Sequence, residues 1–370
     1  MVSFSQKINL VKGFLTGDTA FGGPSFVSID VTRRCNLQCL CCLYHSPLVE
    51  VSAKEDLSMD ISPDLFHEVC SELKTMGTNL IIIEGEGEPL LHARIFDLIS
   101  IAKSMGFQVM LFTNGIMLDE TRVLHIIDLK VNILKVSLWA SSPEDYAQNY
   151  PKSDIRNFER VIDGLKLLTH LKSKKKTSFP FVELCNPINL YNFQKTEKML
   201  DILFTTGCNS LFFSPVNSHQ GKFASFSLSP DEEKLFILSL KEIKKRLDSV
   251  STHHNIDQVL LRYKIGEAVW EKLPCYIAWY YSRIKVDGTI LPCNRCDLPM
   301  GNLNQYSFHH IWNAPDYRAF RRKTITRNGL SLFSKHCNCG FCCHVVNNKR
   351  VHEIARWLSP FPSVFRRNRG

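Results

Sequence analysis

Short apolar segments alternate with longer amphipathic segments through the first part of the chain. The apolar segments are rich in Val, Ile, Leu and Phe, as expected of strands that are buried in a sheet. The amphipathic segments carry apolar residues at helical spacing, between polar caps and glycines. The pattern predicts strands at 25–32, 80–83, 109–112, 133–138, 181–184 and 211–214, and helices at 62–76, 95–105, 120–129, 155–171 and 193–204. These repeats predict an α/β fold with parallel strands and helices outside them.

The pattern changes beyond residue 228. Ser229-Pro230-Asp231 begins a lysine-rich amphipathic helix that is predicted to run to Leu247, and a polar segment follows at 249–257. Residues 286–293 predict an apolar hairpin with an Asp-Gly turn. The last residues predict a short amphipathic helix that begins at Val351 and is broken by prolines. We therefore expect an N-terminal extension (1–24), a core domain (25–228), a helical linker (229–268), a cysteine-rich domain (269–350) and a basic tail (351–370).

A C-x3-C-x2-C run follows the first predicted strand, at Cys35, Cys39 and Cys42. Three thiolates at this spacing can hold three irons of a four-iron cluster and leave the fourth iron without a protein ligand. An open coordination position is where a metal centre does chemistry. Cys41 could compete for iron, but only Cys42 keeps the spacing. A zinc site or a set of buried free thiols is the alternative interpretation.

A second group of cysteines lies beyond residue 268. Of the 14 cysteines in the chain, seven fall in this part. Short-range clusters of this kind favour metal binding over a disulfide framework. The group comprises Cys275, Cys293, Cys296, Cys337, Cys339, Cys342 and Cys343.

The composition indicates a globular chain. With 370 residues, of which 44% are hydrophobic and 22% charged, the chain can bury a substantial core. Neither a signal sequence nor an apolar stretch of about eighteen residues is present. We therefore expect a cytoplasmic protein without a membrane span.

The formal charge of +9 raises the possibility of a nucleic-acid partner. The basic residues are concentrated in local runs at 172–176, 241–246, 321–323 and 366–369. Solvated helix ends and an exposed tail account for such runs. We therefore do not expect nucleic acid or a membrane surface as a partner.

The cysteine run at 35–42 resembles the signature of the radical S-adenosylmethionine (radical SAM) superfamily. The resemblance implies that Cys35, Cys39 and Cys42 bind a 4Fe-4S cluster whose open iron is chelated by SAM. It also implies a partial (β/α)6 TIM-like barrel, with ligands at the C-terminal ends of the strands. Cys41 departs from the family pattern, which usually has an aromatic residue at this place.

Further family resemblances fall at the ends of the predicted strands. Residues 84–91 look like the G-G-E-P element, although Glu86 stands in place of the first glycine of the pair. The resemblance implies that backbone carbonyls there accept hydrogen bonds from the SAM ammonium group. The implied SAM-binding residues are Gly85, Glu86, Gly87, Glu88, Pro89, Thr113, Asn114 and Ser137. An ordinary turn at residues 84–91, a turn at residues 113–115, or a structural role for Ser137 stays open. Glu183, Asn186 and Asn217 are expected at the same mouth of the barrel.

The cysteine-rich domain resembles the SPASM and twitch extensions of radical SAM enzymes. Gly288 and Cys293 match the G-x4-C spacing with which these extensions begin. Asn348 and His352 stand where the full SPASM pattern has its next cysteines. The resemblance implies one auxiliary 4Fe-4S cluster, held by Cys275, Cys293, Cys339 and Cys342. Cys296, Cys337 and Cys343 remain possible substitutes or ligands of a second centre, His336 and His344 are expected to be neighbours and not ligands, and a zinc knuckle is the alternative.

The resemblance implies that reductive cleavage of SAM gives a 5′-deoxyadenosyl radical, which removes hydrogen from a substrate carbon. Fewer than thirty residues precede the first strand, so we expect a small substrate such as a sugar or aminocyclitol that is oxidised or rearranged. A peptide or protein maturase is one alternative, and a non-catalytic iron-sulfur electron carrier is another. A flavodoxin or ferredoxin is the expected electron donor. No general base is assigned.

Overall fold

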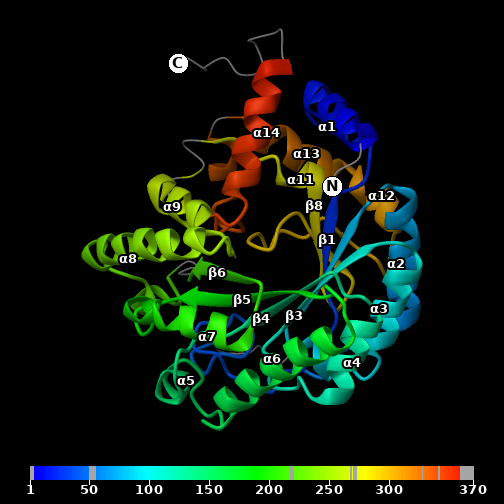
Figure 1. The fold of residues 1–370 in the computed structure, drawn as a ribbon. Coiled ribbons are helices and arrows are strands. Elements are labelled where there is room, and N and C mark those ends of the chain that lie inside the picture. The colour runs from blue at the N-terminus through cyan, green and yellow to red at the C-terminus, as the bar shows by residue number, and fades with distance from the viewer. Residues whose placement is uncertain are drawn as a thin grey trace.

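A computed structural model describes residues 4–49, 56–216, 221–266, 269, 273–326, 328–340 and 342–358. Within these residues the strands form one sheet, in the order β10-β9-β8-β1-β2-β3-β4-β5-β6-β7 (Figure 1). The strands are β1 (Phe26–Asp30), β2 (Leu80–Glu84), β3 (Gln108–Thr113), β4 (Ile133–Ser137), β5 (Phe181–Ile188), β6 (Ser210–Pro215), β7 (His253–His254), β8 (Tyr281–Ile284), β9 (Thr289–Leu291) and β10 (Gly301–Asn302).

The predicted strands of the core are confirmed as β1 to β6, which pair in parallel with their neighbours in chain order. This is the partial barrel that the sequence predicts. Two further strands extend it in parallel, β7 beside β6 and β8 beside β1. The strand β8 belongs to the cysteine-rich domain, so that domain continues the sheet of the core (Figure 1).

Helices form an arc around the outside of the core strands (Figure 1). Side chains alternate along β3: Val109 and Leu111 are fully buried beneath the helices, whereas Met110 and Phe112 are half-buried on the interior face. The strands β2 and β6 show the same alternation, so their interior face is more open than the sequence predicts. The helices are α2 (Pro63–Thr75), α3 (Ile95–Ser104), α4 (Glu120–Asp128), α6 (Asn157–Lys174) and α7 (Lys198–Thr206), with the unpredicted α5 (Pro143–Asn149) after β4.

The lysine-rich helix is confirmed as α8 (Pro230–Ser249), which begins with a capping box between Ser229 and Glu232. The segment expected to be a polar linker contains β7 and leads into α9 (Ile256–Ile265). The hairpin of the cysteine-rich domain is also confirmed: β8 and β9 are antiparallel around an Asp287-Gly288 turn, and Gly288 has φ +81°. Its first strand begins earlier than predicted.

The remaining helices surround this hairpin. The N-terminal extension contains α1 (Phe4–Thr16), which packs against α11 (Ile277–Tyr280) and α14 (Val345–Leu358) (Figure 1). The tail helix α14 begins six residues before the predicted start at Val351, and its prolines lie outside the described residues. None of the described helices is both long enough and apolar enough to cross a membrane. The helices and 3-10 turns are α11 (Ile277–Tyr280), α12 (Phe308–Trp312), α13 (Pro315–Thr324), α14 (Val345–Leu358), η1 (Pro89–Leu91), η2 (Phe193–Lys195), η3 (Ala224–Phe226) and η4 (Gly329–Phe333).

Candidate functional site

The cysteines of the C-x3-C-x2-C run lie in the loop that follows β1. Burial raises the pKa of Cys35 to about 12, and the charges of Glu88 and Cys42 add to the shift. Burial also raises the pKa of Cys39, together with the charges of Cys42 and Cys35. The charge of Cys42 therefore disfavours the ionisation of Cys35 and Cys39, which places the three thiols in one site. Iron fits this donor set, because thiolate ligands are neutralised by the metal that they bind.

Cys42 and its neighbour Cys41 have different surroundings. The Sγ atom of Cys42 accepts hydrogen bonds from the backbone N–H groups of Tyr44 and His45, both at 3.4 Å. Cys41 is buried in a small hydrophobic cluster with Phe223, apart from the main core. These surroundings favour Cys42 as the third ligand and give Cys41 an apolar packing role.

Glu88 ties the loop after β2 to the end of β3. Its carboxylate accepts hydrogen bonds from Thr113 Oγ1 at 2.7 Å, from the Asn114 N–H at 2.6 Å and from the Leu90 N–H at 3.1 Å. The side chain is buried, and burial raises its pKa although these hydrogen bonds favour the charged form. Asn114 Nδ2 in turn donates to Asn36 Oδ1 in the cysteine loop, at 2.7 Å. The side chains of Glu88 and Thr113 are thus committed to holding two loops together.

Gly87 permits the closest approach between the loop after β2 and the cysteine loop. A Cβ atom at this position would lie 2.1 Å from the carbonyl oxygen of Arg34, so only glycine fits. The N–H of Glu88 donates to the same carbonyl at 2.7 Å. The side chain of Glu86 is also engaged, since it accepts a hydrogen bond from Arg33 Nε at 2.6 Å. Any contact of Glu86 or Glu88 with SAM would therefore use the backbone.

Ser137 lies at the end of β4 and is half-buried. Its hydroxyl oxygen accepts a hydrogen bond from Trp139 Nε1 at 3.0 Å. Glu88, Thr113, Asn114 and the cysteine loop are joined by hydrogen bonds, whereas the side chain of Ser137 contacts Trp139 instead. Its assignment as a SAM contact stays a prediction.

A charged pair that the sequence did not predict lies on the interior face of the barrel. Lys135 of β4 forms an ion pair with Glu183 of β5 at 2.7 Å, and the two side chains are 10% and 17% exposed. The Lys135 Nζ atom also lies 3.8 Å from the centre of the Phe212 ring. The presence of Lys135 within the apolar segment that forms β4 is the sequence feature that could have predicted this pair. The pair places opposite charges two residues below Ser137 in the barrel interior.

Replacing Lys135 with methionine is expected to lower the free energy of unfolding by about 3 kcal/mol, because Glu183 would be left as an unpaired charge in a mostly buried place. Adding Glu183→Gln should restore most of the loss. Urea unfolding of the cluster-loaded protein under anaerobic conditions measures both effects. Equal stability of wild type and Lys135→Met would show that Glu183 is solvated or neutral and would contradict the prediction.

The prediction for Asn186 is wrong. Strand alternation puts Asn186 on the opposite face of β5 from Glu183. There it is buried, and its Nδ2 donates to the carbonyl oxygen of Leu138 at 2.7 Å, so it does not face the mouth. Asn217 lies outside the described residues.

The four predicted auxiliary ligands are brought together. Cys275 precedes α11, Cys293 follows β9, and Cys339 and Cys342 lie before α14. All four line one pocket, together with Arg295, His344 and Asn348 among others. Burial raises the pKa values of Cys275 to about 12 and of Cys342 to about 11. Soft thiol donors that converge on an apolar pocket fit an iron-sulfur cluster.

Asn348 supports this pocket where the full SPASM pattern would have a cysteine. Its Oδ1 accepts hydrogen bonds from the N–H of Tyr276 at 2.9 Å and from the hydroxyl of Tyr280 at 3.2 Å. Its Nδ2 lies 3.8 Å from the sulfur of Cys275. The amide thus orients a predicted ligand. His352 lies beside it and contacts the hydroxyl of Tyr276 at 2.9 Å.

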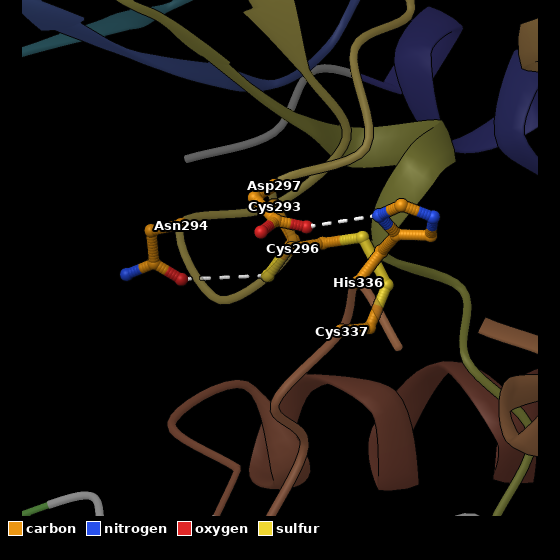
Figure 2. The surroundings of a disulfide bond; sticks show 6 residues. All are labelled: Cys293, Asn294, Cys296, Asp297, His336 and Cys337. Atoms are coloured by element: carbon orange, nitrogen blue, oxygen red, sulfur yellow. Dashed lines mark hydrogen bonds and ion pairs between the residues drawn. A yellow bond between two sulfur atoms is a disulfide. The ribbon is translucent and has the colours of Figure 1, made fainter. Parts of the chain in front are cut away.

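Cys296 and Cys337, which also line this pocket, are joined by a disulfide (Figure 2). Figure 2 shows the ring of His336 beside Asp297 and next to the sulfur atoms. The Nδ1 atom of His336 lies 3.3 Å from Oδ1 of Asp297. The disulfide links the turn after Cys293 to the segment that carries Cys339 and Cys342. In this state the two cysteines are not available as substitute ligands. Among the described residues, no three Cys, His, Asp or Glu side chains are grouped so as to hold a single metal ion.

Two family models match the chain. The model described as "Radical SAM superfamily" matches residues 29–182, and the SPASM model, described as "Iron-sulfur cluster-binding domain", matches residues 275–349. Each match lies within one of the domains expected from the sequence. Together the matches cover more than half of the chain.

Similar proteins extend the match over most of the length. A protein of Pyrococcus furiosus named as a tungsten-containing aldehyde ferredoxin oxidoreductase cofactor-modifying protein is 22% identical over 88% of this chain and 90% of its own. An AdoMet-dependent heme synthase of Methanosarcina barkeri is 24% identical over 85% of this chain and 90% of its own. The structure of Streptococcus suis SuiB with its precursor peptide SuiA has a TM-score of 0.65 and 14% identity, and covers 93% of this chain and 76% of that one. The chain therefore belongs to the radical SAM superfamily and combines its SAM- and 4Fe-4S-binding core with a SPASM iron-sulfur cluster-binding domain.

Proposed function

We propose that this chain is a radical SAM enzyme in which Cys35, Cys39 and Cys42 hold the cluster that binds SAM. The observation that carries the proposal is that these three cysteines lie on one loop at the C-terminal end of β1, where the charge of Cys42 raises the pKa values of Cys35 and Cys39. Three protein ligands leave one iron for SAM.

The loops around this site have distinct tasks in the proposal. The backbone of Gly85 to Pro89 receives the SAM amino group, and Glu88 holds that loop against Asn114 and the cysteine loop. Ser137 contacts the ribose or carboxylate. When bound, the cluster and SAM supply the 5′-deoxyadenosyl radical that removes hydrogen from a substrate carbon. The interior face of the partial barrel lies beside this step and limits the access of water to it.

The pocket of Cys275, Cys293, Cys339 and Cys342 holds one auxiliary 4Fe-4S cluster in this proposal. Its lining is largely apolar, apart from groups such as Arg295 and Asn348, and this favours a buried cluster over a solvent-exposed one. If the reaction is a net oxidation of the substrate, this auxiliary cluster can accept the electron that the substrate releases. Cys343, which is exposed, is not needed as a ligand.

The substrate in the proposal is a small organic molecule that is oxidised or rearranged. Support comes from the two relatives that align over more than four fifths of this chain, since their names concern a cofactor and heme. A sugar or aminocyclitol remains the predicted subclass. A peptide is the second candidate, because the SuiB structure holds a precursor peptide. Reduction requires an electron donor, for which a flavodoxin or ferredoxin stays the prediction.

The reaction class is tested by reconstituting the clusters without oxygen, adding SAM and dithionite, and measuring 5′-deoxyadenosine. We expect formation by the wild type and none by Cys39→Ala, because two cysteines cannot hold the SAM-binding cluster. No nucleoside from wild-type protein that is shown to contain its iron would contradict the enzyme and favour an electron carrier.

The substrate class is tested with cell extract separated by ultrafiltration. For a small molecule, the filtrate should stimulate 5′-deoxyadenosine formation, and protease treatment of the filtrate should not abolish the effect. Stimulation that comes only from the retained, protease-sensitive fraction would favour the peptide.

A further inference from the structure

Three charged residues of the β8–β9 hairpin contact the core domain. Arg283 lies in β8, and Lys285 and Asp287 follow it in the connection to β9. Arg283 forms an ion pair with Asp30 at 2.7 Å, and Lys285 forms one with Glu86 at 3.0 Å. Asp287 pairs with Arg33 Nη2 at 2.9 Å. Each of these three charges of the hairpin is therefore matched by an opposite charge of the core.

The core partners flank the cysteine loop on both sides. Arg33 lies two residues before Cys35, and it also donates through Nε to Glu86 at 2.6 Å. At the other end of the loop, Arg283 Nη2 donates to the hydroxyl of Tyr44 at 3.2 Å, two residues after Cys42. The hairpin thus contacts the segments that enter and leave the loop of cluster ligands.

The ion pair between Lys285 and Glu86 reaches the loop after β2, which we propose binds SAM. Glu86 stands where the family pattern has a glycine, and its carboxylate is drawn to Arg33 on one side and Lys285 on the other. Its side chain is 1% exposed, and that of Arg33 is 9% exposed. A buried carboxylate held by two cations has little freedom to move. The substitution of glycine by Glu86 therefore links the SAM loop to the C-terminal domain.

The same hairpin also carries an auxiliary ligand. Its second strand, β9, ends at Leu291, and Cys293 follows two residues later. One short element, continuous with the core sheet through the parallel pairing of β8 with β1, therefore connects the two cluster sites. The hydrogen bonds of a buried charge pair are directional, so these pairs favour one placement of the hairpin against the core.

The geometry points to Arg283, Lys285 and Asp287 as positioning residues that fix the cysteine loop and the SAM loop relative to the auxiliary cluster site. This inference rests on the proposed function, because it takes both loops as the binding site of the cluster and SAM. The hairpin acts through Arg33, Glu86 and Tyr44 and does not itself touch SAM.

The test compares Lys285→Met and Asp287→Asn with wild type, after reconstitution to equal iron content. The SAM dissociation constant, from equilibrium dialysis, is expected to rise about tenfold in each variant. The change that SAM causes in the electron paramagnetic resonance spectrum of the reduced cluster should be smaller. Lys234→Met is the control, since Lys234 pairs with Asp231 on the exposed surface of α8. The control should bind SAM as the wild type does.

The outcomes separate the inference from the proposed function. Unchanged SAM affinity and spectra, with a lower thermal midpoint alone, would overturn the inference and leave the hairpin a purely structural role. Wild-type protein that holds iron but binds no SAM would overturn both. If the variants do not fold, Lys285→Arg and Asp287→Glu keep the charge but move it. They should fold and show a weaker form of the same SAM defect, and wild-type affinity in both would overturn the inference.

Discussion

Cys42→Ala is expected to abolish 5′-deoxyadenosine formation, whereas Cys41→Ala is expected to leave it within about twofold of the wild type. The two cysteines are adjacent, so the pair is a matched comparison at one point of the chain. Cys42 keeps the C-x3-C-x2-C spacing with Cys35 and Cys39, and its charge raises the pKa values of both. Without it, two ligands remain, and the cluster cannot be held in its three-ligand form.

The surroundings of the two sulfurs explain why Cys41 should not substitute. Cys41 is buried against Phe223 in a hydrophobic cluster separate from the main core, and moving its sulfur to the iron would expose that cluster. Iron content and nucleoside formation, measured anaerobically on both variants, provide the check. Loss of activity in Cys41→Ala with retention in Cys42→Ala would exchange the two assignments.

Glu88→Ala is expected to lower the free energy of unfolding by roughly 3 kcal/mol and to abolish measurable SAM binding. Three donors, namely the hydroxyl of Thr113 and the N–H groups of Asn114 and Leu90, would lose a buried acceptor at about 1 kcal/mol each. The link from Asn114 to Asn36 in the cysteine loop would then lose its support. Urea unfolding and equilibrium dialysis with SAM measure the two effects.

Two further variants sharpen this comparison. Glu88→Gln keeps one acceptor oxygen but turns an N–H₂ group toward a backbone N–H, so its loss of stability should be intermediate. Glu159→Ala, on the exposed surface of α6, should change the unfolding free energy by less than about 0.5 kcal/mol. If Glu88→Ala were as stable as Glu159→Ala, water would replace the carboxylate, and Glu88 would not hold the two loops.

The disulfide between Cys296 and Cys337 bears on the auxiliary site. Six cysteines line that pocket, and the disulfide leaves Cys275, Cys293, Cys339 and Cys342 with free sulfurs. These four are the set that the family resemblance implies. The assignment remains a proposal, and the iron content of single alanine variants at these positions would test it.

Features encoded by residues close together in the chain were predictable. The run from Cys35 to Cys42 places its ligands on one loop, and the periodicity of 3.6 or 2 residues marks helices and strands without knowledge of their neighbours. The capped start of α8 at Ser229 and the hairpin turn at Gly288 are local in the same sense. The prediction for Asn186 was wrong because it did not take into account that Glu183 and Asn186 point to opposite faces of β5.

The sequence by itself determined the α/β repeat, the two groups of cysteines and the loops that surround them, because each of these depends on local spacing and composition. Only the tertiary structure decided which distant charges meet. Arg283 and Asp30, and likewise Asp287 and Arg33, are separated by more than 250 residues and face each other because β8 pairs in parallel with β1. Lys135 meets Glu183 for a similar reason, through the register of β4 with β5. Strand pairing at long range is set by the packing of the whole domain, and no local pattern of residues specifies it.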